Sequence, residues 1–219
     1  MNETTLEKPF YLKTWHLFLV IIIAVWLNTW ILQNYVMTRE LYHNLLSEKL
    51  EISRIDDYFN FVRKISIFSY ILVPIIIWIQ LAFVTLLLQF PLVLKFIDIP
   101  FKKIFRVVAF AQISLVVMGL IKTFWLLHFQ PSQITRQTLS FTPLSLTNFL
   151  DISAYPKSAV QVLNNFNVFS IIWCIVLING LSNTKKIKKL DASILVVVVW
   201  TLILVFQWVL VMYFTKINS

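Results

Sequence analysis

Five long stretches of this 219-residue chain consist almost wholly of apolar residues, and they restrict its possible folds more than any other feature. They cover about residues 16–36, 65–94, 104–128, 166–182 and 192–214. A helix needs roughly 20 mostly apolar residues to cross the hydrocarbon core of a bilayer. The sequence therefore predicts an all-α, polytopic membrane helical bundle with five transmembrane helices, organised as a single transmembrane domain over residues 1–219.

The composition excludes several classes of protein. Hydrophobic residues make up 59% of the chain and charged residues 13%, which lies outside the range of soluble domains. Two glycines cannot supply the loops that hold nucleotide phosphates, and one cysteine cannot form an intramolecular disulfide or a thiolate zinc site. We expect no cofactor, no metal and no nucleic acid. The net charge of +9 is assigned to the ends of the spans, where it faces lipid headgroups.

Basic residues concentrate in two short connections between spans, 95–106 and 183–191. Short loops rich in Lys and Arg remain in the cytoplasm. With five spans, this rule places the N-terminus in the cytoplasm and the C-terminus on the outer side of the membrane. The basic residues concerned are Lys95, Lys102, Lys103 and Arg106 in the first loop, and Lys185, Lys186, Lys188 and Lys189 in the second.

Two longer connections fall on the outer side. In residues 37–64, apolar side chains recur at mainly helical spacing among charged ones, which predicts an amphipathic helix or a helical hairpin. This segment is either a docking face for a partner or a helix that lies on the bilayer or on the bundle. Residues 129–165 contain an apolar run, 139–150, that is too short to span, so we expect an interfacial or re-entrant element there.

A charged residue inside a span is a functional hypothesis, and Lys122 in the third span is such a residue. Its ammonium group either extends to the interface along its flexible stem or has a buried partner. Counting along the spans places Asn28, Lys122 and Gln207 in the outer part of the bilayer, where they form a candidate polar cluster. The spans contain no acidic residue, so a proton relay within this chain is not expected.

Amides and one proline complete the polar features of the spans. Gln80, Gln112 and Asn179 are predicted to pack helices together, because amides bond across helices in lipid at about 1 kcal/mol or less. Pro74 should bend the second span, either as a gate or as a static kink. Neither an acid/base pair nor a nucleophile motif stands out, so no catalytic residue is assigned and the chain is not expected to be an enzyme.

Residues 163–173 read Leu-Asn-Asn-Phe-Asn-Val-Phe-Ser-Ile-Ile-Trp and continue through Leu177 to a Gly-Leu pair at 180–181. Before them come a first span, an outer helical segment, a second span with Pro74, a basic turn followed by Phe-Arg-Val-Val-Ala at 105–109, and a loop rich in Ser and Leu. This arrangement resembles the Yip1-domain family over most of the chain.

The resemblance implies a five-span membrane protein without catalytic residues. Eukaryotic members act in vesicle trafficking, and some bacterial members resemble accessory subunits that accompany ABC exporters. The chain has Asn167 where the bacterial pattern often has Asp, and it lacks the Asp-Leu-Tyr-Gly-Pro sequence of the trafficking branch. No role with Rab-type GTPases is therefore carried over.

These observations predict a non-catalytic accessory or scaffold subunit of a larger complex in the bacterial inner membrane, such as an ABC-type exporter. Its partners would be the lipid bilayer and other membrane subunits, including an ABC permease and a periplasmic component. Two alternatives remain open. One is a small stand-alone transporter or channel, and the other is a Yip1-like protein that organises or traffics membranes.

Overall fold

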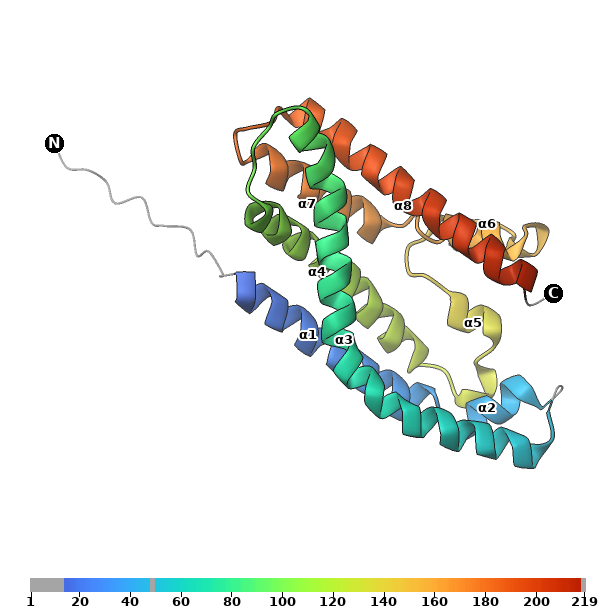
Figure 1. The fold of residues 1–219 in the computed structure, drawn as a ribbon. Coiled ribbons are helices and arrows are strands. Elements are labelled where there is room, and N and C mark those ends of the chain that lie inside the picture. The colour runs from blue at the N-terminus through green and yellow to red at the C-terminus, as the bar shows by residue number, and fades with distance from the viewer. Residues whose placement is uncertain (1–13, 48–49, 218–219) are drawn as a thin grey trace.

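The computed structural model describes residues 14–47 and 50–217, and within these ranges the chain folds into helices without a β-strand (Figure 1). The all-α prediction is confirmed. The predicted cytoplasmic position of the N-terminal tail concerns residues 1–13, which lie outside the described ranges. The α-helices are α1 (Thr14–Ile31), α2 (Arg39–Leu46), α3 (Ile52–Leu94), α4 (Phe101–Leu126), α5 (Arg136–Ser140), α6 (Lys157–Leu163), α7 (Val168–Ser182) and α8 (Lys189–Ile217).

Among the described residues, 4 helical segments are long and apolar enough to cross a membrane, which is the pattern of a multi-pass membrane protein. The fifth predicted span, 166–182, corresponds to α7, an apolar helix of 15 residues. It is shorter than the roughly 20 residues that a perpendicular crossing needs. The predicted count of five is therefore not confirmed. The 4 segments are Thr14–Val36, Ile52–Leu94, Phe101–Leu126 and Lys189–Phe214.

The second span is part of a longer helix than the sequence pattern indicated. α3 is 43 residues long and begins at Ile52, upstream of the predicted span 65–94. No proline or glycine interrupts the chain between Ile52 and Pro74, so nothing ends the outer helix before it enters the apolar region. The amphipathic segment 37–64 thus consists of α2 and the first turns of α3, which pack against each other.

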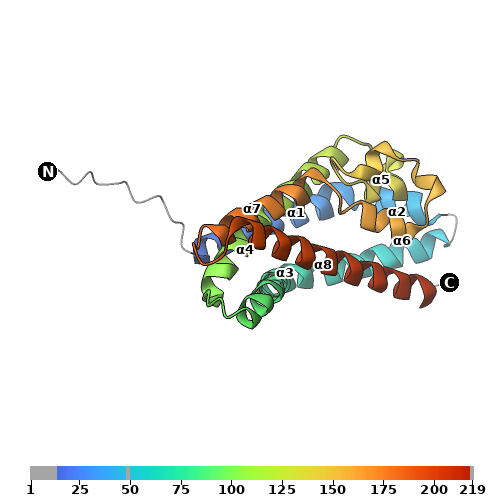
Figure 2. The same cartoon turned by 90° about the horizontal axis from the view of Figure 1, so that it is seen from above.

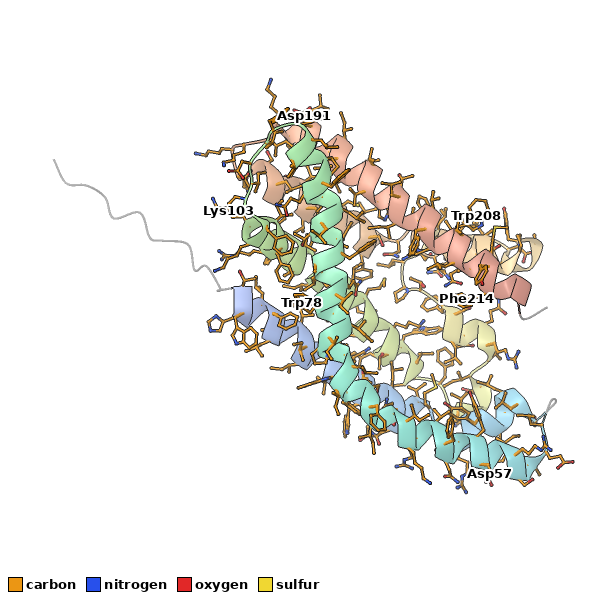
Figure 3. All side chains as sticks on the ribbon, viewed as in Figure 1. Asp57, Trp78, Lys103, Asp191, Trp208 and Phe214 are labelled. Atoms are coloured by element: carbon orange, nitrogen blue, oxygen red, sulfur yellow. The ribbon has the colours of Figure 1, made fainter. Side chains whose placement is uncertain are left out.

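Helix α4 is the centre of the bundle, because it packs against α1, α3 and α7, while α7 in turn packs against α8. The outer half of α3 runs alongside α1. Near Trp78, one turn after Pro74, α3 changes direction and crosses to the beginning of α8 (Figures 1 and 3). From there α8 runs away from α3, so the two helices diverge on the same side of the molecule.

The two basic loops lie together at one end of the bundle. The ammonium group of Lys186 donates a hydrogen bond to the carbonyl oxygen of Asp98. Lys103 and Asp191 lie at this end in Figure 3, whereas Asp57 lies at the opposite end. We call these the basic end and the cap end.

At the cap end, α2, α5 and α6 gather beside the outer ends of α3 and α8 (Figure 2). The amide of Asn44 donates hydrogen bonds to the carbonyl oxygens of Ser132 and Ile134, at 3.0 and 3.2 Å. Arg136 donates through Nη2 to the carbonyl oxygen of Leu45 at 3.2 Å. These bonds fix the beginning of the 129–165 connection to α2, so the cap is a folded unit and not a free loop.

The apolar run 139–150 covers the end of α5, a turn and the short 3-10 helix Leu146–Phe149. Leu144, Leu146 and Phe149 on this run are exposed, with Phe149 83% exposed, whereas Ser145 and Thr147 are buried. Ser145 pairs with Asn167 through an isolated β-bridge, which holds the run against the start of α7. The predicted re-entrant element is therefore not confirmed.

Candidate functional site

A cavity of about 1430 Å³ lies where α3 and α8 diverge. Its walls come from the inner half of α3, the middle of α4 and the outer half of α8, and the α5–α6 segment of the cap lies over its outer end. Small-molecule sites usually enclose about 300–1,000 Å³, so this cavity is large. It is the main candidate for a functional site among the described residues.

The cavity is open on the side between α3 and α8. Phe83 on α3 and Phe206 and Phe214 on α8 line it, yet they are 50%, 57% and 58% exposed. These rings therefore form a rim that faces outward from the bundle. In a membrane this side would face lipid or a neighbouring subunit.

Two amides line the cavity on helices that the sequence predicts to cross the membrane, and of these Gln80 is exposed and Gln112 is partly buried. Gln112 is about 16 Å along α4 from Phe101, and Gln80 is about 21 Å along α3 from Leu94, at the helical rise per residue. For helices that cross perpendicular to a hydrocarbon core about 30 Å thick, Gln112 falls near the middle and Gln80 about two-thirds of the way across. Within the described part of the chain, neither side chain makes a hydrogen bond. Each amide thus offers unpaired donors and an acceptor to a group that enters the cavity.

The outer end of the cavity is polar. The amide of Asn165 donates to Oε1 of Gln207 at 3.0 Å, which joins the α6–α7 connection to α8. Asn167 caps α7, because its Oδ1 accepts from the backbone N–H of Ser170 at 2.9 Å. Gln207 lies about 27 Å along α8 from Lys189, so this end of the cavity reaches the depth of the opposite interface.

Arg136 on α5 is the only charged side chain that lines the cavity within the described residues. Its bond to the carbonyl oxygen of Leu45 uses one of the five N–H donors of a guanidinium. The remaining donors leave Arg136 able to bind an anion at the outer end of the cavity.

The predicted cluster of Asn28, Lys122 and Gln207 divides between two places. Asn28 lies against α4, where its Nδ2 is 3.8 Å from the position that a Cβ on Gly119 would take, and Lys122 is partly buried one turn further along α4. Oδ1 of Asn28 is buried without a hydrogen-bond partner in the described part of the protein. Gln207 lines the cavity, whereas Asn28 and Lys122 are not among its lining residues.

The three amides assigned to helix packing also differ. Gln80 and Gln112 both line the cavity, so the structure brings them to one site. Asn179 is on α7 and is exposed.

Sequence reasoning missed Arg136 and the asparagines before α7. The cluster of Asn164, Asn165 and Asn167 was visible as a polar interruption immediately before an apolar helix, a common signal for a helix N-cap. It also missed Trp173, which lines the cavity at 5% exposure and whose indole N–H has no acceptor in the described structure.

Comparisons of the chain with protein-family models, with curated proteins and with solved structures find no match, so its resemblance to the Yip1-domain family stays a prediction.

Proposed function

We propose that this chain is a non-catalytic accessory subunit of a larger membrane complex, of the kind that accompanies an ABC-type exporter. The observation that carries the proposal is that Gln80 and Gln112, on two helices long and apolar enough to cross a membrane, line a cavity that opens sideways and make no side-chain hydrogen bond within the described part of the chain. Unsatisfied amides are costly in hydrocarbon. A partner subunit that packs over the opening can supply hydrogen-bond partners for both groups.

The proposal includes five membrane crossings. α7 lies between the cap end, where Asn167 caps it, and the basic end, where Gly180 packs tightly on Val107 of α4. A short span is accommodated by local thinning of the bilayer, at a modest free-energy cost. With five crossings, the basic end is cytoplasmic by the positive-inside rule and the cap end is periplasmic. The membrane concerned would be the bacterial inner membrane.

The surface proposed for the partner is the rim formed by Phe83, Phe206 and Phe214. Association of helices in lipid depends on close packing and on interhelical hydrogen bonds, at about 1 kcal/mol or less for each bond. The rim supplies apolar packing, and the two amides behind it supply donors and acceptors. The hydrogen-bonded cap offers a second surface on the outer side for an extracytoplasmic component.

A photocrosslinking experiment in native membranes tests this proposal. Benzoylphenylalanine replaces Phe206 on the rim or, as a matched control, Phe110, which is 54% exposed on α4 and does not line the cavity. We expect a discrete protein adduct from position 206 and none from position 110. Equal labelling from both positions, or no protein adduct from 206, would contradict the proposed interface.

A stand-alone transporter is the second candidate, and the size and polar outer end of the cavity favour it. Purified protein in liposomes should then move a solute, and Gln112→Leu should reduce that flux because it removes a polar group from the cavity. Lys122→Leu serves as the control, since Lys122 does not line the cavity. Absence of flux for every solute tried would remove this candidate.

A further inference from the structure

We propose that the cavity between α3 and α8 is a binding site for one lipid with an anionic headgroup. Its acyl chains would occupy the apolar part between α3, α4 and α8, and its headgroup would lie at the outer end beside Arg136. The inference requires the membrane location but not the accessory role, because a lipid can fill the cavity with or without a partner over the rim.

The shape of the opening supports a lipid. The rim residues Phe83 and Phe206 are exposed although they line the cavity, so its interior is continuous with the surroundings of the bundle. In a bilayer those surroundings are acyl chains, which can enter sideways without crossing water. A soluble ligand would have to pass the cap instead, where α6 packs on α8 and Asn165 is bonded to Gln207.

The polarity of the walls follows that of a lipid along its length. Away from the cap the walls are mostly apolar, with Leu87 on α3, Leu115 on α4 and Ile203 on α8, and the amides of Gln80 and Gln112 interrupt them. Toward the cap end they carry the amides of the α6–α7 connection and the side chains of α5. A ligand that fits both ends has a long apolar part and a polar group that can accept hydrogen bonds.

The charge of the outer end selects the headgroup. Arg136 is the one charged residue in the described lining, and no carboxylate stands beside it there to attract a cationic headgroup. A guanidinium binds phosphate and carboxylate groups through paired N–H donors. The hydrogen bond from Nη2 to the carbonyl oxygen of Leu45 holds Arg136 at the outer end of the cavity, where its other N–H donors can make such a contact.

Native mass spectrometry of the full chain, delipidated in detergent, tests the proposal. The probes are dioleoylphosphatidylglycerol, which is anionic, and dioleoylphosphatidylcholine, which has the same chains and no net charge. We expect one molecule of phosphatidylglycerol per chain, bound about fivefold more tightly than phosphatidylcholine, the factor that corresponds to about 1 kcal/mol for one basic residue at a lipid surface. Equal affinity for both lipids, or graded binding of many copies, would overturn the proposal.

Two pairs of variants locate the site. Ile203→Trp fills the cavity and should abolish the single bound lipid, whereas Ile194→Trp changes an exposed residue of the same helix outside the cavity and should leave it bound. Arg136→Gln should remove the preference for the anionic lipid, and Arg136→Lys should restore part of it. Retention of the single bound lipid in folded Ile203→Trp protein would show that the lipid binds elsewhere and would refute the assignment.

A fluorescence measurement confirms the position if Ile203→Trp protein does not fold. Trp173 and Trp200 line the cavity. Phosphatidylglycerol with brominated chains should quench the tryptophan fluorescence of the wild-type protein. The fraction quenched should be smaller in the Trp200→Phe variant, which lacks one of the two indole rings in the cavity. The control is Trp15→Phe, which alters an exposed ring on α1. Equal loss of quenching in both variants would contradict binding in the cavity.

Discussion

The indole N–H of Trp26 donates a hydrogen bond to the carbonyl oxygen of Tyr70 at 2.8 Å. Tyr70 is four residues before Pro74, so its carbonyl is the acceptor that loses its helical partner because proline has no N–H. α1 thus satisfies the backbone group that the bend in α3 leaves free. In lipid, where no water can take that place, such a bond stabilises both the bend and the packing of α1 on α3.

Trp26→Phe should therefore destabilise the protein by about 1–3 kcal/mol, the cost of a backbone acceptor left without a partner. Unfolding in mixtures of dodecyl maltoside and sodium dodecyl sulfate measures the effect. In a Pro74→Ala background the N–H of residue 74 can bond to Tyr70, so Trp26→Phe should cost much less there. An equal cost in both backgrounds would show that the effect comes from lost ring packing alone.

Pro74→Ala should also straighten α3. The inner half of α3 is held in the core by Leu81, Leu88 and Leu92, which are at most 2% exposed. Its outer half would then swing away from α8. The one cysteine of the chain, Cys174, is first replaced by serine, so that spin labels attach only to introduced cysteines. The distance between labels at positions 57 and 212 should then increase on straightening. The distance between a control pair at 86 and 198, near the basic end, should stay unchanged. Unchanged distances for both pairs would show that other contacts set the bend.

The contact between α4 and α7 depends on Gly180. A Cβ added there would lie 2.3 Å from Cγ1 of Val107, which is too close for two carbon atoms. Gly180→Ala should cost about 1–3 kcal/mol in unfolding free energy through overpacking. Val107→Ala in the same chain should recover most of it. Gly119→Ala is the control, because the nearest atom there is 3.8 Å away, and it should leave stability almost unchanged.

Hydropathy predicted the all-α class and the approximate places of four long spans, because each of those segments is uniformly apolar over its crossing. It did not predict that α3 begins at Ile52, because the outer turns of α3 are charged and do not share the hydropathy by which the apolar inner turns were recognised. The amides show the same limit. Counting gives depth along a helix but not direction around it, so it grouped Gln207 with Asn28, whereas α8 presents Gln207 to Asn165. Predicting that Gln80 and Gln112 line the same cavity would have required the rotation of α3 relative to α4, which the sequence does not give.

The unpaired amide of Gln112 leads to the last prediction. Replacing it with leucine removes an unsatisfied polar group from a site near mid-membrane depth, so Gln112→Leu should raise the unfolding free energy of the isolated protein by up to about 1 kcal/mol. Gln33→Leu should do the opposite, because Nε2 of Gln33 donates to Oγ of Ser69 at 3.2 Å and its loss removes a bond between α3 and the π-helical end of the first span. If Gln112 contacts a partner or a ligand, less of that partner or ligand should co-purify with the Gln112→Leu protein from native membranes than with the wild-type protein. A stabilised Gln112→Leu protein with unchanged recovery of partner and lipid would mean that this amide has no binding role.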